Sequence, residues 1–154
     1  MQITDTSMTI PLAASASRRR SRVPAHQLRI NQEGIFCDLP VFSTLIPWDE
    51  IAALVPYTFQ FLGDYSVLGI VPRDYNALIT RTIEEHAKYI WQKAWYHLLD
   101  SINTWFSHGS NALTPIHIYE LTLPISINEL LAAIQERFAV ELCEHHVTIR
   151  DWQH

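Results

Sequence analysis

The chain turns a corner within one short stretch, Ser43-Thr44-Leu45-Ile46-Pro47-Trp48-Asp49-Glu50-Ile51. Apolar residues alternate up to Pro47, which has no amide hydrogen and therefore marks the edge or a corner of a sheet. Trp48 and Ile51 stand three positions apart, so a tight turn between them would bury both side chains. The stretch predicts the end of one strand, a single turn, and the start of the next strand.

A second stretch, Pro124-Ile125-Ser126-Ile127-Asn128-Glu129-Leu130-Leu131, predicts the start of a helix. Ser126 followed three residues later by Glu129 is the capping-box pattern, in which the two residues satisfy each other's backbone N–H groups. Apolar residues then recur on one helical face, at Leu130, Leu131, Ile134 and Phe138. We predict a C-terminal helix over residues 126–139.

Alternating apolar residues predict strands around these two stretches, at residues 27–31, 35–39, 42–46, 53–62, 65–71 and 116–123. Gly34 and Gly63 supply the turns of two hairpins, because glycine tolerates positive φ. Gly69 stands inside a strand, where a missing side chain indicates a bulge or a close approach of backbone. Residues 140–152 are left open between an edge strand and an irregular tail.

Residues 73–108 predict a long helix, because they contain neither Pro nor Gly and are apolar every third or fourth position. Asp74 is the expected N-cap and Gly109 the residue that ends the helix. A second apolar stripe contains Trp91, Trp95, Leu99 and Phe106. A helix with two apolar sides must pack twice or meet a partner.

Residues 1–25 are predicted to form a flexible basic leader, with one short strand near residues 8–13 left open. Their four arginines against Asp5 give a net charge of +3, whereas the whole chain carries −5, so the rest of the chain carries −8. Nucleic acid is not an expected partner, because phosphate binding needs a basic patch. No stretch approaches the 18 uninterrupted apolar residues of a membrane-spanning helix.

The motifs resemble those of a bacterial PH-like family of small proteins, the STM3941 type. The resemblance is carried by Ile30-Asn31-Gln32-Glu33-Gly34-Ile35, by Ile46-Pro47-Trp48-Asp49-Glu50-Ile51, and by the phrase that begins at Pro124. It implies an α+β fold: a PH-like half-open antiparallel barrel with a long inserted helix (73–108) and a capped C-terminal helix, in one domain over residues 26–152. The family supplies no catalytic residues.

Reactive side chains do not form a recognisable catalytic or metal pattern. Cys37 and Cys143 stand among apolar residues, so both are expected to be small buried hydrophobic residues and not nucleophiles. His145 and His146 are adjacent and would point to opposite faces of a strand, which makes shared metal ligation difficult. We therefore expect no enzyme activity, no metal, no cofactor and no small-molecule substrate.

The sequence favours a non-enzymatic interaction module that binds a protein partner or self-associates through the Trp-rich helix. The expected interface residues are Trp91, Trp95, Leu99, Trp105 and Phe106. One alternative is peripheral membrane association, with anionic lipid contacted by Arg18, Arg19, Arg20 and Arg22. Another is a small acidic inhibitor or immunity-type protein. The expected location is the cytoplasm, with the inner face of the membrane left open.

Overall fold

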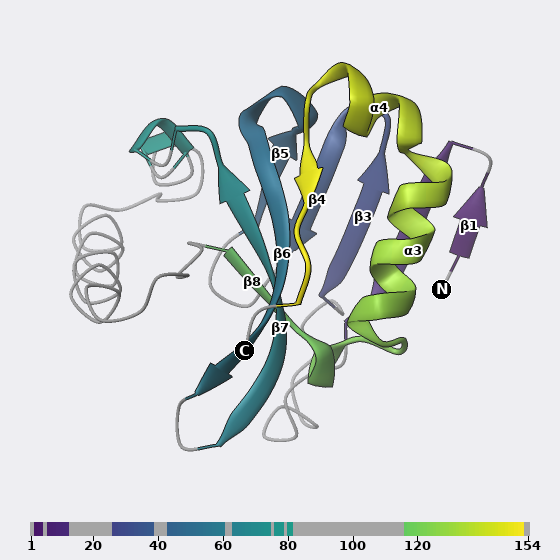
Figure 1. Ribbon diagram of the computed structural model, residues 1–154. Coiled ribbons are helices and arrows are strands. Elements are labelled where there is room, and N and C mark those ends of the chain that lie inside the picture. Colours follow the sequence, from purple (N-terminus) through teal and green to yellow (C-terminus); the bar gives the residue numbers. More distant parts are fainter. Residues whose placement is uncertain are drawn as a thin grey trace.

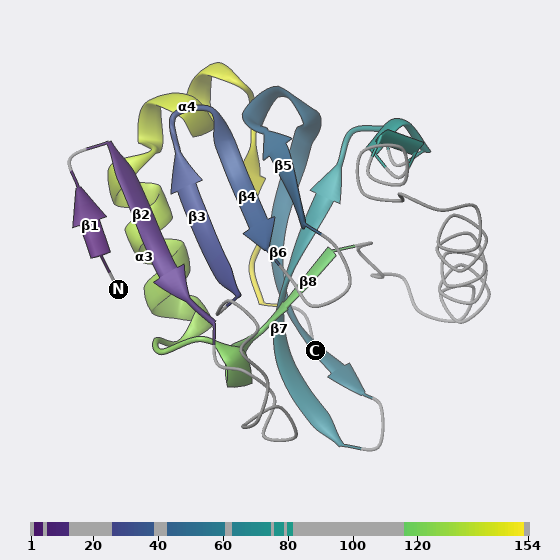
Figure 2. The same ribbon diagram turned by 180° about the vertical axis from the view of Figure 1, so that it is seen from behind.

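A computed structural model describes residues 2–4, 6–12, 26–38, 43–60, 63–74, 76–78, 80–81 and 116–152 (Figures 1 and 2). Its strands are β1 (Gln2–Thr4), β2 (Ser7–Pro11), β3 (Gln27–Asn31), β4 (Gly34–Asp38), β5 (Ser43–Pro47), β6 (Ile51–Gln60), β7 (Asp64–Pro72), β8 (Ile116–Tyr119) and β9 (Thr148–Ile149). Its helices are η2 (Trp48–Glu50) and η3 (Glu120–Thr122), both 3-10, with α3 (Ile127–Arg137) and α4 (Ala139–Glu144).

The strands form two sheets, so the fold is mixed α+β. Five antiparallel strands follow chain order, β1-β2-β3-β4-β5, and four strands lie in the order β8-β7-β6-β9. Within the described residues no strand pairing joins the two sheets. Helix α3 lies across one face of the five-stranded sheet, and the β6–β7 hairpin extends beyond that sheet (Figures 1 and 2).

The main core lies between the two sheets and α3. Ile30, Ile35 and Ile46 come from the five-stranded sheet, Leu54 and Ile70 from the other sheet, and all are fully or almost fully buried. Apolar residues of α3 complete this core at Ile127, Leu130, Leu131 and Ile134. The alternation that predicted the strands therefore also selects the residues that join the layers.

The predicted corner at residues 48–51 is confirmed. Trp48 is 1 % exposed and Ile51 is fully buried, in one cluster. The Trp48 backbone N–H donates to the Glu33 carbonyl (3.3 Å), and its indole Nε1 donates to the Asn31 carbonyl (2.9 Å). The Trp48 ring also packs on Phe138, with 5.8 Å between ring centroids. The corner is thus bonded to the β3–β4 turn and packed against the end of α3.

The capping box at the start of α3 is confirmed as well. The Ser126 hydroxyl accepts from the Glu129 N–H, and the Glu129 carboxylate accepts from the Ser126 N–H. A second carboxylate, from Glu120, accepts from the Ile127 N–H at 2.9 Å. The helix start therefore holds two acidic side chains where its unpaired N–H groups and dipole favour negative charge.

The predicted flexible leader is wrong for the residues that the structure describes within it. Residues 2–4 and 7–11 are strands of the five-stranded sheet, and Met8 pairs with Ile30. The strand left open near residues 8–13 is β2. Residues 2–4 and 6–12 therefore belong to the folded domain, because the apolar side chains of Met8 and Ile10 enter the main core.

Three other boundaries differ from the sequence predictions. The strand expected at 116–123 ends at Tyr119, because η3 follows, and the Thr122 hydroxyl donates to the Tyr119 carbonyl. Residues 139–144 are helical, whereas only residues 148–149 form the edge strand left open for this region. The bulge in β6 lies between Ile51 and Ala53 and not at Gly69, where the register is regular.

The long helix is described only at its start. Residues 76–78 and 80–81 are helical, and the Asp74 carboxylate accepts from the Ala77 N–H at 3.0 Å, which confirms Asp74 as the N-cap. Leu78 is 2 % exposed and belongs to the main core. Residues 73 and 74 are not helical, and residues 75, 79 and 82–108 of the predicted helix lie outside the described part of the chain.

We predict that Gly34→Ala destabilises the fold more than the matched change Gly63→Ala. Both glycines have positive φ (155° and 147°), so the backbone strain of the two substitutions is similar. A Cβ at Gly34 would lie 2.1 Å from the Ile46 carbonyl oxygen, whereas one at Gly63 would lie 3.6 Å from the Tyr65 ring. Urea unfolding should show an additional loss of about 1–3 kcal/mol for Gly34→Ala. Equal losses would contradict the steric argument.

Candidate functional site

Arg73 connects the end of β7 to the corner and to the end of α4. Its backbone N–H donates to the Glu50 carbonyl (2.8 Å) and its Nε to the Asp49 carbonyl (2.9 Å). Its guanidinium also donates to the carbonyls of His145 and His146. A cation among carbonyls at the end of a helix is favourable, because the helix dipole is negative there. Arg73 therefore stabilises the arrangement of three segments that lie far apart in sequence.

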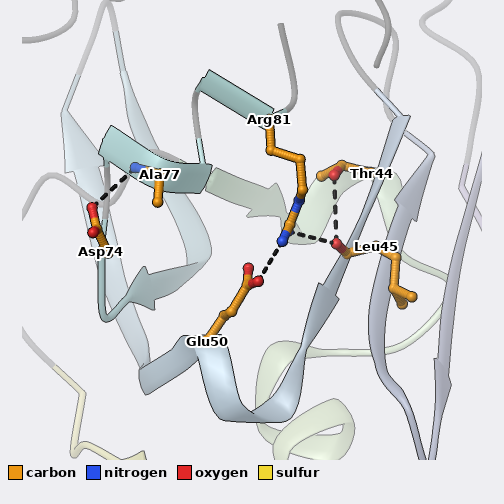
Figure 3. A network of polar contacts seen from close by, with 6 residues as sticks. All are labelled: Thr44, Leu45, Glu50, Asp74, Ala77 and Arg81. Carbon is orange, nitrogen blue, oxygen red and sulfur yellow. Dashed lines mark hydrogen bonds and ion pairs between the residues drawn. The ribbon is translucent and has the colours of Figure 1, made fainter. Parts of the chain in front are cut away.

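Arg81 makes a second polar connection, from the first helical turns after β7 to strand β5. Its guanidinium forms an ion pair with the Glu50 carboxylate and donates to the Leu45 carbonyl at 3.1 Å, as Figure 3 shows. The two charged side chains are about one third exposed, so the ion pair itself contributes about 1 kcal/mol or less. The geometric effect is that the described residues of 76–81 are held against the edge of β5.

The outer face of the β8-β7-β6 sheet carries a second apolar cluster, separate from the main core. Ala53, Val55, Tyr57 and Val67 are buried in it, and Tyr65, Val71 and Tyr119 pack against it half-buried. In strand register these residues alternate with those of the main core, so both faces of this sheet are apolar. A strand that is apolar on both faces is typical of a sheet buried on both sides.

Gly69 lies at the centre of this outer face, paired with Val55 on one side and His117 on the other. The Tyr57 and His117 rings meet edge to face, with 5.9 Å between centroids, although their strands are separated by β7. Strands two apart lie about 10 Å from each other, so both rings must lean over the middle strand. The missing side chain of Gly69 leaves room for them, which explains a glycine in a regular strand.

Two further ring contacts extend this aromatic cluster. Tyr65 and Tyr119 meet at 6.3 Å and His117 and Tyr119 at 6.4 Å, both nearly perpendicular. Burial raises the pKa of Tyr119, and the neighbouring Tyr65 raises it further. The Tyr119 phenol is therefore neutral at neutral pH, which suits contact with apolar or aromatic groups.

The two cysteines differ, although the sequence predicted burial for both. Cys37 is fully buried in the main core, and burial raises the pKa of its thiol to about 12. Cys143 lies exposed on α4, so its predicted burial is wrong. The reason is the local structure: residues 139–144 form a helix in which Leu142 packs against the main core, while Cys143 lies on the exposed side with Val140. Cys37 cannot supply a thiolate at neutral pH.

The residues that the sequence selected as an interface lie outside the described part of the chain. This holds for Trp91, Trp95, Leu99, Trp105 and Phe106, and equally for Arg18, Arg19, Arg20 and Arg22. Among the described residues, no group of three His, Cys, Asp or Glu side chains could hold a metal ion. No helix among them is long and apolar enough to cross a membrane.

Sequence reasoning missed the two arginine connections and the aromatic cluster over Gly69. Arg73 and Arg81 act on carbonyls that lie 24 to 73 positions away, so no local pattern identifies them. The aromatic cluster had a readable signal, namely a glycine in a strand flanked by strands with alternating Tyr and His residues.

The chain was also compared with known proteins. No protein-family model matches it, and neither the curated proteins nor the solved structures give a match.

We predict that stability falls at high pH because of Cys37. Burial raises the pKa of its thiol from the ordinary value of 9.0 to about 12, so the folded state holds a proton that the unfolded state has lost. The contribution is fully present below about pH 9 and is lost as the pH rises through about 12, at about 1.4 kcal/mol per pH unit. Urea unfolding of wild type and Cys37→Ala between pH 8 and 11 measures this. Parallel curves for the two proteins would contradict it.

We predict that Tyr65→Phe lowers the pKa of Tyr119. The substitution removes a neighbouring phenolate whose charge opposes ionisation of Tyr119, whereas burial keeps the pKa above that of a free tyrosine. Absorbance titration in the near ultraviolet, with Tyr119→Phe to assign the transition, reports the change. An unchanged or higher Tyr119 pKa would show that the two rings do not interact electrostatically.

Proposed function

We propose that this protein is a non-enzymatic interaction module of PH-like architecture, which self-associates or binds a protein partner through the aromatic segment 91–106.

The PH-like part of the proposal is supported by the order of the elements. A five-stranded antiparallel sheet is followed by a second sheet begun by a long hairpin, and a C-terminal helix joins the core of both through Ile127, Leu130 and Ile134. In a PH-like half-open barrel, the two sheets and the C-terminal helix also follow one another along the chain in this order. The sharp corner at Trp48, which leads from the first sheet into the second, is the element that such an arrangement requires.

The observation that supports the binding function is the amount of apolar sequence in the chain, because the β8-β7-β6 sheet is apolar on both of its faces. One face of this sheet serves the main core, and the other carries Val55, Tyr57 and Val67 with a rim of half-buried Tyr65 and Tyr119. The sequence of residues 73–108 adds two apolar stripes. Val55, Tyr57 and Val67 are at most 4 % exposed, so the proposed interface is assigned to the second of these stripes and not to the sheet; apolar and aromatic residues beyond the needs of one core are typical of proteins that assemble with a partner.

The non-enzymatic part is supported by the roles of the reactive side chains. Cys37 is held as a neutral thiol in the core, while Arg73, Arg81 and Glu50 are engaged in contacts that connect segments of the fold. Glu129 and Glu120 cap α3. Each of these groups has a structural task.

Light scattering of the wild type and of Trp91→Gln/Trp95→Gln tests the proposal. We expect the wild type to have the mass of at least two chains and the variant to have the mass of one chain while it stays folded, because the two apolar rings are replaced by polar side chains. Circular dichroism and urea unfolding establish that the variant is folded.

Leu121→Gln is the matched control, because Leu121 is 74 % exposed on η3 and the change is also from apolar to polar. This control should leave the mass unchanged. A wild type that has the mass of one chain at all concentrations contradicts self-association, and a control that dissociates in the same way shows that the effect is not specific to residues 91–95.

A further inference from the structure

Among the described strands, β5 forms one edge of the five-stranded sheet, and the directions of its backbone groups follow from one hydrogen bond. Trp48 N–H donates to the Glu33 carbonyl, and these two residues continue the register of the β4–β5 ladder as a hydrogen-bonded pair just beyond its end. Hydrogen-bonded and non-hydrogen-bonded pairs alternate along an antiparallel ladder. The pairs of Leu45 with Phe36 and of Ser43 with Asp38 are therefore non-hydrogen-bonded, and the Leu45 and Ser43 backbone groups point away from β4.

Two features of the chain leave fewer outward backbone groups of β5 free to pair with another strand. Arg81 donates to the Leu45 carbonyl at 3.1 Å, and its ion pair with Glu50 holds the guanidinium in place (Figure 3). Pro47 stands at the next outward position and has no N–H to offer. Proteins protect edge strands by such charged side chains and prolines, because an open edge pairs with another strand.

We propose that β5 is a latent pairing edge that Arg81 keeps closed, and that its occupant, once this contact opens, is β5 of a second copy of the chain. Ser43, Thr44, Leu45 and Ile46 carry no charge, so two copies do not repel each other. An antiparallel pair centred on Leu45 places the N–H of each Leu45 opposite the carbonyl of the other, which satisfies a two-fold axis. The proposal is independent of the aromatic segment 91–106.

The test compares Arg81→Ala with Arg150→Ala, which removes the same charge from an exposed residue at the other sheet. Both changes are made in the Trp91→Gln/Trp95→Gln background, so that association through the aromatic segment does not contribute. Light scattering over a range of concentrations should show Arg81→Ala at twice the mass of one chain and Arg150→Ala at the mass of one chain. Hydrogen exchange should show the Leu45 amide more protected in the dimer.

Ser43→Pro, added to Arg81→Ala, identifies the surface. It removes an outward N–H and leaves the bonds of β5 to β4 intact, so the mass should return to that of one chain. Should Arg81→Ala fail to fold, Glu50→Gln releases Arg81 more gently and is measured in the same way. A folded variant that stays monomeric, or a dimer in which the Leu45 amide is not protected, overturns the proposal.

Discussion

The structure depends on the burial of Trp48 at the corner between the two sheets. Its indole N–H and its backbone N–H both donate to the β3–β4 turn, at Asn31 and Glu33, and its ring packs on Phe138 at the end of α3. One residue thus fixes the five-stranded sheet, the entry to the second sheet and the C-terminal helix relative to each other. A buried indole without its acceptor would leave a polar N–H in the core, so the ring and the turn constrain each other.

The tight turn that follows Trp48 has a second consequence for the fold. A 3-10 turn leaves carbonyls without partners in the turn, and those of Asp49 and Glu50 accept from Arg73 at the end of β7. The start of β6 and the end of β7 are therefore held together by the corner as well as by their own ladder. Because Arg73 also bonds to the end of α4, the corner determines where the C-terminal residues run.

The parts of the fold that were predictable are those decided by neighbouring residues. The capping box of Ser126 and Glu129, the cap at Asp74 and the turn at Gly34 each need only a few adjacent positions. Strand β2 could not be predicted from neighbouring residues in this way, because residues 7–11 become a strand by pairing with β3, which lies beyond an intervening segment. Cys37 and Cys143 both have apolar neighbours in sequence, but Cys37 stands on the buried side of β4 and Cys143 on the exposed side of α4.

Two sheets that do not pair with each other in the described residues have edges, and this chain covers them by different means. The side of β6 that faces away from β7 is covered by backbone, because β9 pairs with it in parallel and the Arg150 N–H donates to the Leu54 carbonyl. The edge of β5 is covered by a side chain, Arg81. A paired strand such as β9 satisfies several backbone N–H and C=O groups at once. A partly exposed arginine satisfies one carbonyl, and water competes for its guanidinium. The two edges therefore differ in how readily they open, and β5 is the weaker of the two.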